Sequence, residues 1–171
     1  MTDERLPCLD LLEATPGIVR GLISELTDDD ARWKPAPDRF SVAEVLAHLS
    51  HSESHCYRMR LDRFLAEPRP TFEADDAQMH LALYRGADPQ EAFDRFEEQR
   101  QANVQYLSSL PSEAGSRVAL HQEAGEITLN HMLHEWALHD LGHVRQIAEL
   151  VRARKYLHGA GPLGNSYQLR P

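Results

Sequence analysis

Two histidines in this sequence share a spacing that could bind a metal ion. His139 and His143 are four residues apart, and because a helix advances about 100° per residue, both side chains would project from one face. On a helical wheel both rings fall within the apolar stripe that contains Trp136 and Ile147. Burying two imidazoles without partners would cost roughly 1–3 kcal/mol each. The pattern indicates either a metal ion held from one side or two core histidines that hydrogen-bond to other helices.

A third ligand would have to come from another helix, and one earlier segment offers three candidates. His48 lies nearest the margin of that segment's apolar stripe, whereas His51 is turned furthest toward solvent. His55 lies on the same side as His48 but about 10 Å further along the helix axis. Because only one of these two could reach the same ion, the wheel favours His48.

Other polar residues near these histidines have weaker claims. Glu53, Asp76 and Asp140 are candidates for a supporting role or a fourth ligand, although each is better explained as a surface or packing carboxylate. Gln146 lies about one turn past His143 and could orient a ligand or a bound water. No residue stands out as a general base, so the sequence assigns no catalytic residue.

Other metal and catalytic motifs fail on spacing. The HExxH pattern of zincins is absent, because the histidine that follows His134 and Glu135 is His139, five residues from the first. The deaminase pattern needs PCxxC, and the one Pro-Cys pair lacks a second cysteine. Ferritin-like sites need two Glu-x-x-His motifs, and the chain has none. There is also no P-loop, GxGxxG or GxSxG motif.

The elements that must position these side chains are helices, because apolar residues recur at three- and four-residue spacings and no convincing strand alternation is found. Ser41 and Glu44 form a possible capping box before the second helix, and Asp88 and Glu91 form another before the third. In the first helix, Pro16 either lies in the first turn after a Thr15 cap or kinks a longer helix. The pattern predicts helices over 9–26, 41–66, 88 to before Pro111, and 128–154.

The connections between these helices indicate their topology. One is short, whereas the links over 67–87 and between Pro111 and Thr128 are long, and the first could hold a short helix around Ala77 to Tyr84. The Gly- and Pro-rich tail after residue 157 is predicted to be extended or a loop. A simple up-down-up-down bundle needs no long links. We therefore predict an all-α, four-helix bundle with long crossovers, formed by a single domain over 1–171.

Composition narrows the function further. Hydrophobic residues make up 42% of the 171 residues and charged residues 26%, which is ordinary for a globular protein. The net charge of −9, with no basic stripe, argues against a nucleic-acid partner. No signal peptide and no membrane-spanning stretch are recognisable. Cys8 and Cys56 have no metal-type spacing and are expected to be reduced thiols of a cytoplasmic protein.

A resemblance to a known family covers nearly the whole chain. The segment FSVAEVLAHLSHSE is similar to the signature W-S-x-x-E-x-x-x-H-L, with Phe40 in place of Trp. The segment ITLNHMLHEWALHDLGHVRQI is similar to the signature H-x-x-x-H-x-x-Q-I, and the opening LLEATPGIVRGLISEL also matches. On these residues the chain resembles the DinB/YfiT-like superfamily of metal-dependent enzymes. Residue by residue, the signatures place the metal ligands at His48, His139 and His143.

The resemblance implies a DinB-like bundle of up-down-down-up order and a homodimer. It also implies one divalent metal ion, which such ligands would accept as Zn, Ni, Fe, Cu or Mn. Characterised members of the family include transferases and isomerases that use bacillithiol, mycothiol or glutathione. The family's name refers to a DNA-damage-inducible gene and implies no activity on DNA.

Three functions are compatible with such a site. The leading hypothesis is a metal-dependent enzyme that takes a small-molecule substrate, with the ion activating a low-molecular-weight cellular thiol for S-transfer. The first alternative is a metal-dependent hydrolase, in which the ion activates water. The second is a non-enzymatic metal-binding or stress-related module.

Overall fold

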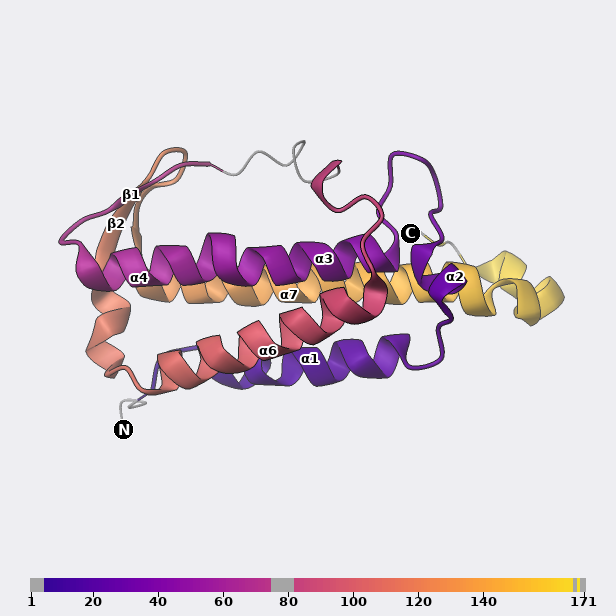
Figure 1. The fold of residues 1–171 in the computed structure, drawn as a ribbon, viewed down its shortest axis with the longest axis horizontal. Coiled ribbons are helices and arrows are strands. Elements are labelled where there is room, and N and C mark those ends of the chain that lie inside the picture. Colours follow the sequence, from indigo (N-terminus) through magenta and orange to yellow (C-terminus); the bar gives the residue numbers. More distant parts are fainter. Residues whose placement is uncertain (1–4, 75–81, 168, 170–171) are drawn as a thin grey trace.

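The predicted helical bundle is confirmed by a computed structural model, which describes residues 5–74, 82–167 and 169 (Figure 1). The first long helix is α1 (Leu9–Ile23). The second consists of α3 (Val42–Ser52), a π-helical turn (Glu53–Arg58) and α4 (Met59–Ala66) in one continuous run. The third and fourth are α6 (Pro89–Ser108) and α7 (Leu129–Val151).

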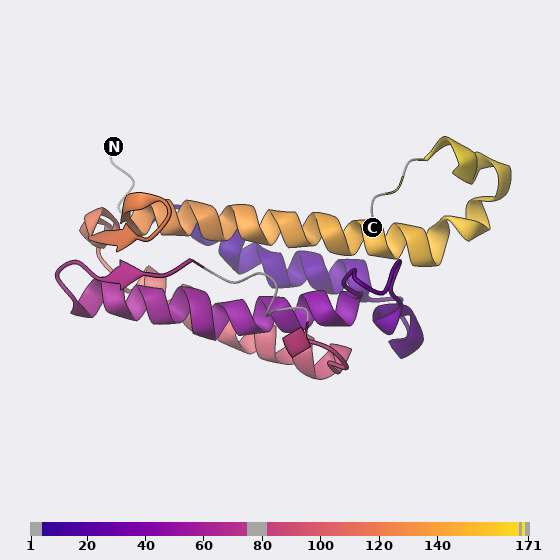
Figure 2. The ribbon, with the colours of Figure 1, turned by 90° about the horizontal axis from the view of Figure 1, so that it is seen from above.

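The four long helices have up-down-down-up order, as the resemblance implied. α1 and α7 run in one direction, whereas the α3–α4 run and α6 both run in the other (Figure 1). α1 packs beside α7 and α3 packs beside α6, so each parallel pair forms one side of the bundle (Figure 2). Parallel neighbours cannot be joined by a short turn, which explains the long crossover before α6. α3 and α7 also pack against each other and run antiparallel.

Local sequence signals set the helix boundaries. Ser41 and Glu44 form the predicted capping box, and Thr128 and His131 form another at the start of α7. Asp88 caps α6 by accepting a hydrogen bond from the backbone N–H of Glu91. These bonds satisfy N–H groups that have no partner within the helix.

The prediction for the first helix was partly wrong. The helix begins at Leu9, so Thr15 is not its cap, and Pro16 lies inside it. α1 ends at Ile23 rather than at residue 26, and a short helix, α2 (Asp28–Arg32), follows with its own capping box at Thr27. The Thr27 cap starts a new helix and so limits the length of α1.

Three short strands were missed in the sequence. β1 (Thr71–Phe72) pairs in parallel with β2 (Val118–His121), and β2 pairs antiparallel with β3 (Gly125–Thr128). The strands are two to four residues long, too short to show an alternating pattern. This small sheet joins the two long crossovers at one end of the bundle (Figure 1).

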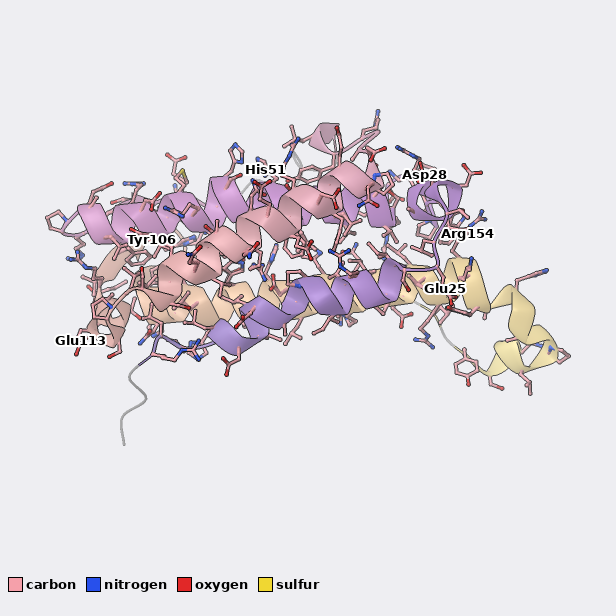
Figure 3. All side chains as sticks on the ribbon, turned by 60° about the horizontal axis from the view of Figure 1, so that its bottom comes forward. Glu25, Asp28, His51, Tyr106, Glu113 and Arg154 are labelled. Atoms are coloured by element: carbon pink, nitrogen blue, oxygen red, sulfur yellow. The ribbon has the colours of Figure 1, made fainter. Side chains whose placement is uncertain are left out.

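The C-terminal tail also differs from the prediction. α7 continues into a π-helical turn (Arg152–Tyr156), and a 3-10 segment (His158–Ser166) replaces the expected extended chain or loop. This segment projects beyond the bundle (Figure 2). Arg154 pairs with Asp30 at 2.9 Å, beside the end of α1 where Glu25 lies (Figure 3). The expected short helix around Ala77 to Tyr84 falls mostly outside the described residues.

The core has two apolar clusters separated by a polar layer. On α7, Trp136 belongs to the cluster near the sheet and Ile147 to the cluster near α2, with His139 and His143 between them. On α6, buried Arg100 lies between Phe96 of one cluster and Val104 of the other. His139 and His143 therefore lie at the level where the core is polar.

No helix among the described residues is long and apolar enough to cross a bilayer.

Candidate metal centre

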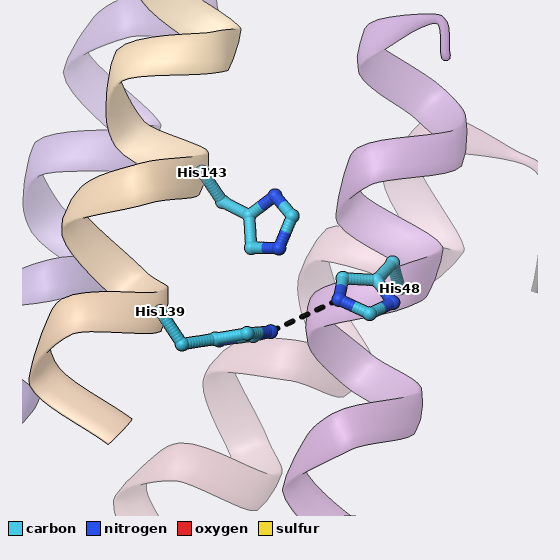
Figure 4. Close-up of side chains that lie close together, drawn as sticks. All are labelled: His48, His139 and His143. Atoms are coloured by element: carbon cyan, nitrogen blue, oxygen red, sulfur yellow. Dashed lines mark hydrogen bonds between the residues drawn. The ribbon is translucent and has the colours of Figure 1, made fainter. Parts of the chain in front are cut away.

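Three partly buried histidines from two helices converge between α3 and α7 (Figure 4). His48 extends from α3 toward His139 and His143 on α7, and one ring nitrogen of each lies within 4.8 Å of the others. The centroid of the His48 ring lies 5.1 Å from that of the His139 ring and 4.6 Å from that of the His143 ring. Because α3 and α7 pack side by side, residues far apart in sequence form one three-nitrogen donor set.

The ring of His143 is oriented with a nitrogen available for a ligand. Its Nδ1 lies 2.9 Å from Oε1 of Gln146, and an amide oxygen can only accept, so Nδ1 carries the proton and Nε2 keeps its lone pair. Burial, with a further contribution from the nearby His139, lowers the pKa of His143 to about 4. The ring is therefore neutral near pH 7, which is the form that binds metals.

The rings of His48 and His139 approach each other through their Nε2 atoms. Their Nε2 atoms are 2.9 Å apart, so in the metal-free protein one must donate a proton that the other accepts. A divalent ion bound by both nitrogens would replace that shared proton. Two imidazole nitrogens directed at one point, beside the free Nε2 of His143, fit a His₃ metal centre.

His48 is held by two aromatic residues. The ring of Phe40 stacks on it at 6.3 Å between centroids, and the hydroxyl of Tyr84 lies 3.4 Å from its Nδ1. The same hydroxyl lies 3.0 Å from Nδ1 of His51. Tyr84 is buried and was not recognised in the sequence, because its proximity depends on the crossover before α6 folding back over α3.

Beside the histidines lies a buried ionic cluster of Glu53, Arg100 and Asp140. Arg100 donates to Glu53 and to Asp140, each at 2.6 Å, and all three side chains are at most 1% exposed. Burial alone would raise the pKa of Asp140, but its neighbours His139 and Arg100 hold that pKa below its usual value. Asp140 is therefore ionised, and the three side chains of the cluster pair with one another.

The role of this cluster could be inferred only in part from the sequence. Glu53 and Asp140 are buried carboxylates that pair with Arg100, and neither is among the clustered histidine ligands. Arg100 was missed, although it falls at helical spacing within the apolar face of α6, between Phe96 and Val104. An arginine in an apolar stripe is the signal that could have revealed the cluster.

The remaining histidine predictions have mixed outcomes. His131 and His134 are exposed, as the wheel indicated. His51 was expected to be the most exposed residue of its group, yet it is half-buried and His55 is exposed. The reason is tertiary, because Tyr84 covers His51. Asp76 lies outside the described residues. Among the described residues, neither Cys8 nor Cys56 forms a disulfide bond.

A cavity of about 550 Å³ lies against Tyr84, between α3 and α6. His51 lies on α3 at this side of the bundle (Figure 3). The cavity is lined by both basic and polar side chains, among them Ser50, His51, His55, Arg95 and Gln99. Tyr84 thus stands between this cavity and the His48 ring.

Comparison with known proteins supports the fold. The sequence profile of the DinB superfamily matches residues 11–147. Among solved structures, YfiT from Bacillus subtilis, described as a probable metal-dependent hydrolase with an unusual four-helix bundle topology, superimposes with a TM-score of 0.73. That match has 24% sequence identity and covers 85% of this chain and 84% of YfiT. No curated protein sequence gives a significant match.

Proposed function

The chain belongs to the DinB superfamily, and on that premise we propose that it is a metal-dependent hydrolase whose ion is held by His48, His139 and His143. The observation that carries this proposal is the convergence of three ring nitrogens within 4.8 Å. Three protein ligands leave a coordination position for water or substrate, as in catalytic rather than structural zinc sites. A divalent ion bound there would supply Lewis acidity and lower the pKa of a coordinated water.

The chain's own residues would keep the ligands ready for the ion. Gln146 holds the proton of His143 on Nδ1, and burial keeps that ring neutral. Phe40 and Tyr84 restrict the ring of His48. Because the rings are already oriented before the ion binds, little side-chain entropy remains to be lost on binding.

The substrate is proposed to be a small molecule. The cavity against Tyr84 has a volume of about 550 Å³, which is within the range of ligand pockets, and it adjoins the proposed centre without including His48, His139 or His143 in its lining. Its lining includes both arginine and glutamate side chains as well as hydroxyl groups. Such a surface would favour a polar substrate over an apolar one.

Water is preferred as the nucleophile because YfiT, which shares this fold, is described as a probable metal-dependent hydrolase. Transfer of a cellular thiol, the leading hypothesis from the sequence, is the second candidate and rests on the family resemblance. Both candidates need the same three ligands, so they differ only in the nucleophile that the ion would activate.

The experiment is a turnover screen of protein loaded separately with Zn²⁺, Ni²⁺, Fe²⁺ and Mn²⁺. Ester, amide and phosphoester substrates test hydrolysis, and an electrophile with bacillithiol, mycothiol or glutathione tests transfer. We expect hydrolysis that is lost in His143→Ala and retained in His134→Ala. Thiol consumption without hydrolysis would favour the transferase, and stoichiometric metal without any turnover would favour the binding module.

A further inference from the structure

One buried atom of the metal centre has no partner. Nδ1 of His139 makes no hydrogen bond to any described residue, although it is shielded from solvent. A buried polar atom without a partner costs roughly 1–3 kcal/mol. The Oδ1 atom of Asp140 lies 3.8 Å from this nitrogen, so a closure of about 1 Å would bring the two to hydrogen-bond distance.

The carboxylate of Asp140 is fixed from its other side. Arg100 donates from Nη1 to Oδ2 at 2.6 Å and from Nη2 to Oδ1 at 2.9 Å, which forms a two-bond fork. The guanidinium is itself held by Glu53 and by the backbone carbonyl of Leu12. Asp140 is therefore an ionised acceptor whose position is set by α1, α6 and the π-helical turn.

We infer that Asp140 is the positioning residue for His139, a role that rests on the metal site of the proposed function. When Nε2 of His139 ligates an ion, Nδ1 carries the ring proton and needs an acceptor. The carboxylate of Asp140 accepts a hydrogen bond from that Nδ1–H, which fixes the ring and makes its Nε2 more basic. Partners of this kind contribute about ten- to a hundredfold to metal affinity. Arg100 holds the carboxylate in place. Through Arg100, α6 contributes to the proposed metal centre although it carries none of the three ligands.

A matched pair of variants tests this role. Asp140→Asn and Glu53→Gln each remove one negative charge that lies 2.6 Å from the same buried guanidinium. We expect both metal-free variants to lose similar melting temperature, since each weakens the same cluster. Only Asp140→Asn should weaken Zn²⁺ binding, by about tenfold or more in a chelator competition, and shift the absorption bands of bound Co²⁺. Equal affinity losses in the two variants, or unchanged affinity in Asp140→Asn, would overturn the inference.

A measurement on the unsubstituted protein covers the case in which a variant does not fold. In the Zn²⁺-loaded protein, nitrogen-15 NMR of the histidine rings should show His139 protonated at Nδ1, with a slowly exchanging, downfield-shifted proton. Zinc on Nδ1 instead, or a rapidly exchanging proton, would exclude the role. Failure of the wild-type protein to bind any metal would overturn both this inference and the proposed function. Metal binding without hydrolysis would overturn the hydrolase alone.

Discussion

At the scale of single residues, the proposed metal centre depends on three imidazole nitrogens that lie within 4.8 Å of one another. Gln146 sets the tautomer of His143, and the 2.9 Å approach of His48 to His139 shows that two further nitrogens meet there. These three rings are partly buried, and burial distinguishes them from a histidine such as His134. His134, on the same helix, is exposed and bonds the backbone carbonyl of Asn130.

Substitution of one ligand should therefore remove the ion. We expect one metal ion per chain in the wild-type protein, and His143→Ala should lose most of it because two nitrogens remain. His134→Ala is the matched control, since it removes an imidazole from the same helix outside the cluster. Elemental analysis after gel filtration measures the stoichiometry. Equal metal retention in the two variants would contradict the ligand assignment.

Burial of neutral His143 also predicts a pH dependence of stability in the metal-free protein. Its pKa is about 4 in the folded state and about 6.5 in the unfolded chain. Between these values the unfolded state binds a proton that the folded state does not, so the free energy of unfolding falls as pH drops from 6.5 to 4. The loss from this group reaches at most about 3 kcal/mol, and none follows below the folded-state pKa.

Urea denaturation in the presence of a chelator, at several pH values in this window, measures the effect. Other acidic groups titrate in the same range, so the comparison is with His143→Gln, which lacks the ring. The slope of unfolding free energy against pH should be shallower in the variant. Identical slopes would show that His143 is not buried as a neutral ring.

At the scale of elements, a polar layer crosses the bundle between two apolar clusters. Arg100 of α6 bridges Glu53 of the π-helical turn and Asp140 of α7. The side-chain amide of Asn103 donates to the backbone carbonyl of Glu53. Glu53 is the first residue of the π-helical turn, where the backbone hydrogen bonds change from the α-helical to the π-helical pattern. Such π-helical turns occur frequently at functional sites. Here the turn directs Glu53 inward and brings Tyr57 edge-on to His139 at 5.5 Å.

Removal of the central cation should be far more costly than removal of a surface one. Arg100→Met leaves two buried carboxylates without their partner, and we expect a loss of about 3–5 kcal/mol in unfolding free energy. Arg95→Met is the control, because Arg95 is exposed on the same helix and should change stability by about 0.5 kcal/mol or less. Urea denaturation at neutral pH compares them, and similar costs would refute a central role for the cluster.

At the scale of the whole molecule, the proposed metal centre would link α3 to α7 without being the main source of the fold. Leu46 of one apolar cluster and Trp136 of the other are fully buried, and neither cluster contains one of the three proposed ligands. The up-down-down-up order makes α3 and α7 antiparallel neighbours. This order therefore determines which faces of α3 and α7 lie opposite each other and can bind the same ion.

Metal removal should lower stability and leave the bundle folded. An ion at a free concentration one hundred times its dissociation constant stabilises the folded state by about 2.7 kcal/mol. For a chain of this size that corresponds to roughly 5–10 °C in melting temperature. Thermal melts followed by circular dichroism, with and without a chelator, measure the shift. Loss of the helical signal at room temperature on chelation would show that the ion is structural.

The homodimer implied by the resemblance is also open to test. Leu138 and Leu141 lie about one turn apart on α7 and are 70% and 48% exposed, and we propose that they contribute to a dimer interface. Leu138→Glu should then yield a monomer in analytical ultracentrifugation. Leu163→Glu is the control, because Leu163 is 76% exposed in the C-terminal 3-10 segment. A monomeric wild-type protein at tens of micromolar would contradict the proposal.

The sequence by itself determined the features that depend on local physics. Helix caps such as Ser41 and Thr128 satisfy N–H groups within three residues of themselves, so helix starts could be located from short segments. Apolar periodicity identified the buried face of α7, and with it the pair His139 and His143. The same reasoning favours His48 and needs no contact between the helices.

The tertiary structure decided what depends on contacts between distant segments. The strands β1 and β2 are stabilised by pairing with each other across the bundle end, and neither has a recognisable local pattern. Arg100 could not be paired from sequence, because Glu53 and Asp140 lie 47 and 40 residues away from it. The shielding of His51 likewise depends on Tyr84, brought over α3 by the crossover. Periodicity shows which side chains face inward, but only packing shows which of them meet.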